Sequence, residues 1–265
     1  MRIQLCEHEL YLMNHSLRET AIAPLFKIQD ETSSRSDLAA RQETKFALHH
    51  ADIKKLRRQL EGTGHRLVHN QQVSVVRSVY FDDSKLSAGH ANLNGLGRRR
   101  KLRMRWYDSL GPGNDAYLEV KWRNNRITGK HRLKLHCDQR LSDLTYKQLG
   151  RSLMESVSPT FVPILLAYPD PVLLVEYKRE HFSSADKRLR ITLDYDLTFY
   201  DQTGKRSIST SFPHRMADFL VVEGKTPVGA ERELREMLAP LPLKASRCSK
   251  YVHGLRNIGL IPVGI

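Results

Sequence analysis

The chain has 265 residues, a length that suits one large β domain or two small ones, and its hydrophobic content of 40% is enough for a core. Its 43 basic and 29 acidic residues give a formal net charge of +14, which predicts affinity for phosphates, nucleic acid or an acidic membrane surface. Three scattered cysteines without a CxxC pair argue against a disulfide framework or a zinc site. No apolar run approaches the length of a spanning helix and no signal-peptide core begins the chain, so we expect a cytoplasmic protein.

The predicted elements begin with a weak helical pattern over residues 1–20 and a polar linker over 31–37. Eight strands are expected, at about 41–48, 72–81, 98–108, 115–123, 128–136, 172–182, 188–200 and 218–225. Helices are expected over 51–62, over 142–157 with Ser142 as N-cap, and over 229–238 and 249–258. Residues 90–97 are predicted to form a turn region, and 159–171 a loop bracketed by prolines.

The most basic stretch of the sequence alternates as a strand would. Side chains on a strand point to opposite faces in turn, so residues 101, 103 and 105 share one face and 102, 104 and 106 the other. The first set is Lys101, Arg103 and Arg105, and the second is Leu102, Met104 and Trp106. Four further strands repeat this ionic stripe with an apolar back: Arg41/Glu43/Lys45, Glu119/Lys121, Lys130/Arg132/Lys134 and Glu223/Lys225.

Five strands with cationic stripes would repel one another on a flat exposed sheet. They are consistent with a fold in which the ionic faces converge on a polyanion inside a barrel, and eight antiparallel strands can close around a small ligand. We therefore expect an α+β fold, mainly antiparallel β, built as an eight-stranded closed tunnel barrel with peripheral helices.

Eight short motifs, in this order along the chain, resemble a known family. They lie at residues 41–46, 78–82, 101–107, 117–121, 177–182, 190–194, 222–225 and 249–252, and include Lys-Leu-Arg-Met-Arg-Trp-Tyr and Tyr-Lys-Arg-Glu-His-Phe. Together they resemble the VTC domain, the polyphosphate polymerase module of the vacuolar transporter chaperone complex, which belongs to the triphosphate tunnel metalloenzymes and is related to the CYTH phosphatases. The resemblance implies an N-terminal extension over 1–40, a VTC-like tunnel domain over 41–258 and a C-terminal tail over 259–265.

The resemblance also implies site residues. The implied phosphate-binding residues are Lys45, Arg103, Arg105, Lys121, Lys130, Tyr177, Arg179, Arg190, Ser249 and Lys250, and the ionic stripes add Arg132 and Lys225. Lys134 stays open as an alternative to Lys130. Arg103, Arg105, Lys121 and Lys250 are expected to be catalytic, and Glu223 to be the ligand of a divalent metal, Mn²⁺ or Mg²⁺, which typically uses one or two carboxylates together with substrate phosphates.

Other charged residues have a plainer interpretation. Glu43 and Glu119 are interpreted as ion-pair partners of tunnel cations in preference to metal ligands. The run from Arg98 to Lys101 is as consistent with a solvated basic surface as with a binding role. Arg41 stands where the CYTH phosphatases carry a carboxylate, which favours the polymerase-like members over the hydrolases.

The leading functional hypothesis is a metal-dependent polyphosphate polymerase that transfers the terminal phosphate of ATP onto a growing polyphosphate chain. The alternatives are a metal-dependent inorganic or nucleoside triphosphatase of the same fold and a non-catalytic polyphosphate-binding domain. No aromatic residues interleave with the basic stripes as in single-strand binders, so no specific nucleic-acid partner is expected. Association with a membrane surface or a partner protein is left open.

Overall fold

The computed structural model describes residues 25–35, 41–68, 71–239, 241 and 244–262, and the helical pattern predicted for residues 1–20 lies outside them. Its strands are β1 (Phe26–Arg35), β2 (Arg41–His49), β3 (His65–Leu67), β4 (Ser74–Asp82), β5 (Arg98–Tyr107), β6 (Asp115–Asn124), β7 (Ile127–Cys137), β8 (Asp170–Ser183), β9 (Arg190–Asp201), β10 (His214–Met216) and β11 (Phe219–Pro227). Its helices are α2 (Ile53–Thr63), α3 (Ser87–Leu93), α4 (Tyr146–Ser156), α5 (Val162–Ala167), α6 (Glu231–Leu238) and α7 (Lys250–Asn257), with a 3₁₀ turn η1 (Leu141–Asp143).

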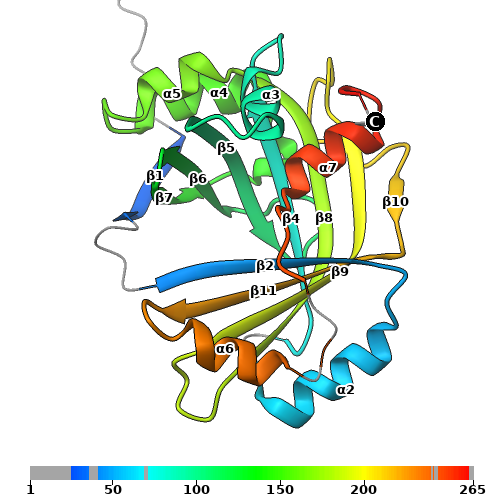
Figure 1. Cartoon of the computed structure of the whole chain (residues 1–265). Coiled ribbons are helices and arrows are strands. Elements are labelled where there is room, and N and C mark those ends of the chain that lie inside the picture. The colour runs from blue at the N-terminus through cyan, green and yellow to red at the C-terminus, as the bar shows by residue number, and fades with distance from the viewer. Residues whose placement is uncertain (1–24, 36–40, 69–70, 240, 242–243, 263–265) are drawn as a thin grey trace, which may run out of the picture.

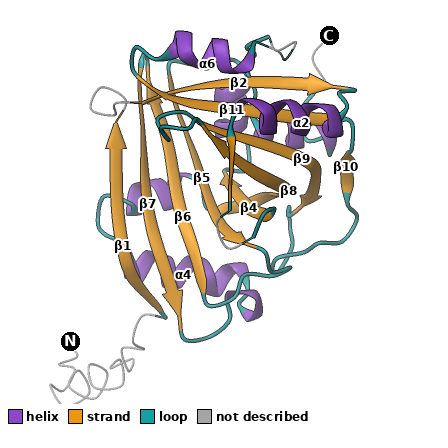
Figure 2. Cartoon of the chain, turned by 90° about the horizontal axis from the view of Figure 1, so that it is seen from below, coloured by secondary structure: helices purple, strands orange, loops and turns teal. Residues whose placement is uncertain are grey.

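All the strands belong to one antiparallel sheet, which curves around an interior (Figures 1 and 2). The hydrogen-bonded order is β1-β7-β6-β5-β4-β8-β9-β11-β2, with β3 added to β8 and β10 to β9. The prediction of a mainly antiparallel α+β fold is therefore confirmed. The predicted number of strands, eight, was wrong, because the described residues form a sheet of eleven strands. Closure of the barrel is not confirmed either, since among the described residues no backbone pairing joins the two end strands, β1 and β2.

Several segments differ from their predicted structure. Residues 31–35 continue β1, which pairs with β7, although their polar composition had indicated a linker. α3 replaces part of the predicted turn at 90–97, and α5 lies within the predicted proline loop, with a proline in its first turn where the missing N–H costs nothing. α4 begins at Tyr146, capped by Thr145 in a capping box with Gln148, so Ser142 is not its N-cap.

Four helices, α2, α4, α5 and α6, cover the outer face of the sheet. α4 and α5 lie over β5, β6 and β7, whose outward residues Leu102, Met104 and Leu118 are fully buried beneath them (Figure 1). α2 and α6 pack on the opposite wall through Leu60 and Leu234, against β9, β11 and β2. On β2, β5, β6, β7 and β11 the apolar side thus faces these helices, and the charged side is left for the interior. Within the described residues, no helix is long and apolar enough to cross a membrane.

The last helix, α7, lies close against β8 and β9. A Cβ at Gly254 would lie 2.4 Å from Leu173 Cδ2 and 2.7 Å from Phe199 Cδ1, so only glycine permits this approach. The helix N-terminus, with Ser249 as N-cap, is thereby held at the edge of the interior. This packing positions two side chains of the candidate site.

Candidate functional site

The inner face of the sheet lines a cavity that, with its opening, encloses about 680 Å³. Seven strands and α7 supply its lining side chains, which include nine cations and two carboxylates. The lining residues are Lys45, Tyr80, Lys101, Arg103, Arg105, Glu119, Lys121, Lys130, Tyr177, Arg179, Glu223, Lys225, Ser249 and Lys250. The charged faces of separate strands therefore line one cavity, as the alternation of the sequence predicts.

Glu119 organises the cations on one wall of the cavity. It pairs across β5 and β6 with Arg103, whose Nη2 lies 2.7 Å from its Oε2, and it lies 3.8 Å from Arg105 Nη1 and 3.5 Å from Arg132 Nε. Burial alone would raise the pKa of Glu119, but Arg103 and Arg105 hold it well below the usual range. The carboxylate is therefore ionised and fixes the guanidinium of Arg103.

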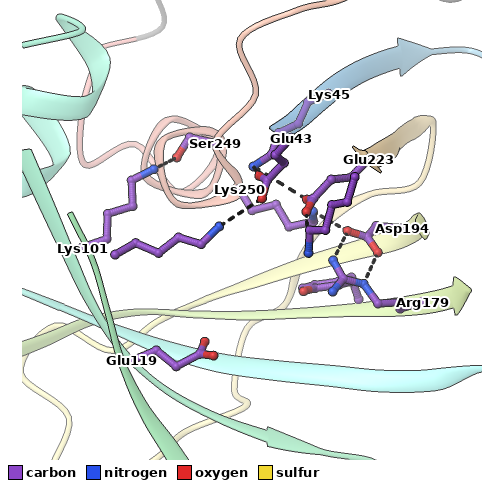
Figure 3. A network of polar contacts seen from close by, with 12 residues as sticks. Glu43, Lys45, Lys101, Glu119, Arg179, Asp194, Glu223, Ser249 and Lys250 are labelled. Carbon is purple, nitrogen blue, oxygen red and sulfur yellow. Dashed lines mark hydrogen bonds and ion pairs between the residues drawn. The ribbon is translucent and has the colours of Figure 1, made fainter. Parts of the chain in front are cut away.

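A second buried carboxylate, Asp194 on β9, fixes two more cations (Figure 3). Arg179 donates to both of its oxygens at 2.6 and 2.7 Å, and Lys250 Nζ donates at 2.6 Å. Asp194 is 0% exposed, and although burial raises its pKa, Arg179 and Lys250 bring it down to about 2. Lys250 also lies 4.7 Å from the centre of the Tyr177 ring. Asp194 thus ties α7 to the strand wall.

Glu43 and Glu223 form a third group at the cavity, on β2 and β11 (Figure 3). Lys45 Nζ lies 3.0 Å from Glu43 and 3.8 Å from Glu223, while Lys225 is 3.2 Å from Glu223 and Lys121 is 3.6 Å from Glu43. Burial opposes ionisation of both carboxylates, but the neighbouring lysines lower the pKa of each. Two ionised carboxylates therefore share Lys45, with Glu223 in the cavity lining and Glu43 beside it.

Two lysines of the site have depressed pKa values: Lys101, which has no carboxylate partner among the described residues, and Lys121, whose partner is Glu43. Lys101 Nζ donates to Ser249 Oγ at 2.8 Å, and in the described part of the chain no carboxylate lies within ion-pair distance of it. Burial, together with the charges of Lys45 and Lys121, lowers the pKa of Lys101 to about 7. Burial lowers the pKa of Lys121 to about 8, although Glu43 opposes the shift. These two lysines would become fully charged beside an anion.

Hydroxyl groups complete the site. Arg103 Nη1 donates to Tyr80 Oη at 3.0 Å, and Arg105 donates to Ser78 Oγ at 3.1 Å and to Tyr177 Oη at 3.4 Å. Tyr80 stacks on Tyr251 of α7 with ring centres 4.8 Å apart. The arginines are thus supported by strands β4 and β8 as well as by carboxylates.

The structure brings together eleven of the predicted site residues at the cavity: Lys45, Arg103, Arg105, Lys121, Lys130, Tyr177, Arg179, Glu223, Lys225, Ser249 and Lys250. Two others do not line it. Arg132 is the cross-strand partner of Glu119, with its guanidinium 3.7 Å from the centre of the Tyr117 ring, and Arg190 is exposed at the start of β9. Lys130 lines the cavity, whereas its alternative Lys134 lies 3.9 Å from Asp115 and does not.

Three residues of the site, Lys101, Asp194 and Tyr80, were not among the predicted phosphate-binding, catalytic or metal-binding residues, although Lys101 was predicted to face the interior. The sequence did indicate that Lys101 faces the interior, because it alternates with apolar residues in step with Arg103 and Arg105 on β5. The indication for Asp194 was weaker: it is the third polar residue of the alternating set Arg190, Thr192 and Asp194 on β9. Tyr80 lies in a hydrophobic strand, and nothing in its local sequence distinguishes its hydroxyl from that of a core tyrosine.

Comparison with models of protein families shows the family to which the chain belongs. The model of the VTC domain matches residues 40–258. The chain belongs to the VTC domain family. Among curated proteins, none matches the sequence.

Two solved structures are similar to this VTC-family chain. One is the PH1819 protein from Pyrococcus horikoshii OT3, with 14% identity, a TM-score of 0.43, and coverage of 78% of this chain and 95% of that one. The other is HpAC1, a putative adenylyl cyclase from Hippeastrum described as having a dominant triphosphatase activity; it has 14% identity, a TM-score of 0.47, and coverage of 82% of this chain and 96% of that one.

Proposed function

We propose that this VTC-family chain is a metal-dependent phosphotransferase that adds the terminal phosphate of ATP to a growing polyphosphate chain. The observation that carries the proposal is the convergence of nine cations on one cavity, against two carboxylates in its lining, Glu119 and Glu223, and two beside it, Glu43 and Asp194. Such an excess of positive charge around one cavity is unfavourable without a ligand, and a linear chain of phosphates supplies closely spaced negative charge to match it.

The arrangement suits phosphoryl transfer, in which positioning and electrostatic stabilisation do most of the catalytic work. Glu119 holds Arg103, and Asp194 holds Arg179 and Lys250, so these cations are already oriented when substrate arrives. Guanidinium groups can bind phosphate oxygens in a planar fork, and lysines contribute compact charge. Arg103, Arg105 and Lys250 are accordingly assigned to stabilise the charge on the transferred group, and Lys121 to bind the chain.

The residues present fit a divalent metal. The described residues contain no group of three or more His, Cys, Asp or Glu side chains that could hold a metal alone. Mg²⁺ and Mn²⁺ commonly use one or two carboxylates and take the remaining oxygens from substrate phosphates. Glu223, with Glu43 beside it, supplies ionised oxygens at the cavity. The metal would neutralise charge on the phosphates that it contacts.

A triphosphatase is the second candidate function. It is favoured by Glu43, which retains a carboxylate next to Glu223 and could orient a water molecule there. Both functions use the same cations and metal ligands, and they differ in whether water or a polyphosphate end attacks the terminal phosphate.

Incubation with ATP labelled in the terminal phosphate and Mn²⁺ separates these functions. A polymerase converts the label into acid-insoluble polymer, whereas a triphosphatase releases it as free phosphate. Arg103→Ala protein, treated in parallel, controls for contaminating activity. Release of free phosphate alone would replace the first proposal by the second. Binding of polyphosphate without turnover under either metal would reject both in favour of a binding domain.

A further inference from the structure

Two arginines extend the ionic face beyond the cavity. Arg99 on β5 and Arg123 on β6 are direct cross-strand partners, one step outside the pair formed by Lys101 and Lys121. Alternation places Arg99 on the same face as Lys101 and Arg103, and places Arg98 and Arg100 on the other face. Like charges directly opposite each other destabilise a sheet. Nevertheless, β5 and β6 place two like-charged cross-strand pairs next to each other, Arg99 with Arg123 and Lys101 with Lys121.

A third arginine, Arg247, lies near Arg99 although it belongs to a distant part of the chain. Arg247 precedes α7 in a segment fixed against β2, where Ser246 N donates to Lys45 O at 2.9 Å. Burial, followed by the charges of Arg123 and Arg247, lowers the pKa of Arg99. Within the described residues, none of these three arginines has a carboxylate at ion-pair distance.

Backbone carbonyls orient two of these side chains without neutralising them. Arg99 Nη1 donates to Leu96 O at 2.5 Å, and Arg123 Nε donates to Asn125 O at 2.6 Å. Each guanidinium has five N–H donors, so most of its donors are left for a ligand. Arg123 and Arg247 are exposed and Arg99 is half-buried, which places the group where the cavity wall meets solvent.

The distance along β5 sets the size of ligand that could use these arginines. Arg99 and Arg105 are six residues apart on one strand, which corresponds to about 20 Å. A triphosphate bound at Arg103 and Arg105 is shorter than this and ends within the cavity. A longer chain leaving the cavity along β5 and β6 would pass Lys101 and Lys121 and then meet the three arginines.

We propose that Arg99, Arg123 and Arg247 form a binding site for the part of a linear polyphosphate chain that extends beyond the cavity. The proposal rests on the proposed function, and it adds that the protein discriminates a long chain from a triphosphate at this site. The bare polyanion is favoured over nucleic acid, because the site offers guanidinium groups without an aromatic platform for bases.

The test compares two double variants that remove the same charge from neighbouring positions. Arg99→Ala/Arg123→Ala removes the proposed site, and Arg98→Ala/Arg100→Ala removes two exposed arginines from the opposite parity of β5. Binding of tripolyphosphate and of long-chain polyphosphate to the full chain is measured by calorimetry. The first variant should bind the long chain about tenfold more weakly and tripolyphosphate as the wild type does. The second should change neither affinity by more than about twofold.

Each outcome decides one question. Equal weakening of long-chain binding in both variants would show that only overall charge matters and would overturn the site. The proposed site would also be overturned if the first variant bound the long chain as the wild type does, or if its affinities for the long chain and for tripolyphosphate fell equally. Arg99→Lys/Arg123→Lys should recover part of the long-chain affinity, and loss as complete as with alanine would contradict a charge-based site. A wild-type protein that does not bind tripolyphosphate would instead refute the proposed function.

Discussion

Binding of phosphate chains should be linked to proton uptake by Lys101. Burial and the charges of Lys45 and Lys121 lower the pKa of Lys101 to about 7. A lysine with that pKa is about one-tenth protonated at pH 8. Phosphate oxygens next to Ser249, which Lys101 contacts at 2.8 Å, would favour its charged form. Binding should therefore complete its protonation.

The expected magnitude is about 0.9 protons taken up by Lys101 at pH 8, falling to about 0.1 at pH 6, where a lysine of this pKa is already charged. Tripolyphosphate also exchanges protons when it binds, so the informative quantity is the difference between the wild type and Lys101→Met. Methionine keeps the length of the apolar stem and removes the titrating amine. The protons of the ligand cancel in this difference.

Calorimetric titrations in buffers of different ionisation enthalpy measure the proton uptake at each pH. Lys54→Met, which removes an exposed lysine on α2, is the matched control and should behave as the wild type. If the wild type and Lys101→Met take up the same number of protons at pH 8, Lys101 does not titrate on binding. A difference that is equal at pH 6 and pH 8 would refute the depressed pKa as its cause.

Three further predictions test the proposed roles of single residues. Glu223→Gln should still bind tripolyphosphate but lose metal-dependent turnover, with only partial recovery at high Mn²⁺; a Mn²⁺ titration that superimposes on the wild type would rule out the ligand role. Arg103→Ala should lower turnover about a thousandfold in a folded protein, and unchanged turnover would move the site elsewhere. Asp194→Asn should lower the free energy of unfolding by about 3–5 kcal/mol in urea, because it leaves two buried cations unpaired. The pKa of Asp194 in the folded protein is depressed to about 2, so the ionised carboxylate stabilises the fold at pH values above its pKa in the unfolded chain. This stabilisation is lost as the pH falls through the folded pKa. A difference in the free energy of unfolding between wild type and variant that does not narrow from about pH 4 to pH 2 would contradict this reasoning.

The local features of the fold could be predicted from the sequence because a strand has a period of two. Leu102, Met104 and Trp106 are buried under helices while Arg103 and Arg105 line the cavity, as their alternation indicates. The faces of β6 and β11 follow for the same reason. This information is contained within about ten consecutive residues, so no knowledge of strand order is needed to obtain it.

Features that depend on the rest of the chain could not be predicted in this way. The polar residues 31–35 become a strand because they pair with β7, about a hundred residues later. α3 forms after Asp82, whose carboxylate accepts hydrogen bonds from Ala88 N and Gly89 N at 2.9 and 2.8 Å and from Tyr251 Oη at 2.6 Å. One of these partners lies 169 residues away, and no local pattern specifies it.

The same limit applies to the chemistry of the site. The sequence shows many cations and several carboxylates, but the pairing of each carboxylate with its cations is set by the order of the strands. Asp194 pairs with Arg179 and Lys250, which come from separate elements, whereas Lys101 has a lysine as its cross-strand partner. The site therefore contains two kinds of cation, those oriented by a buried carboxylate and those that need an external anion. The first kind are suited to bind the reacting phosphate with little reorganisation. The second kind give the bound chain its largest electrostatic gain, because only the ligand can supply their missing counter-charge.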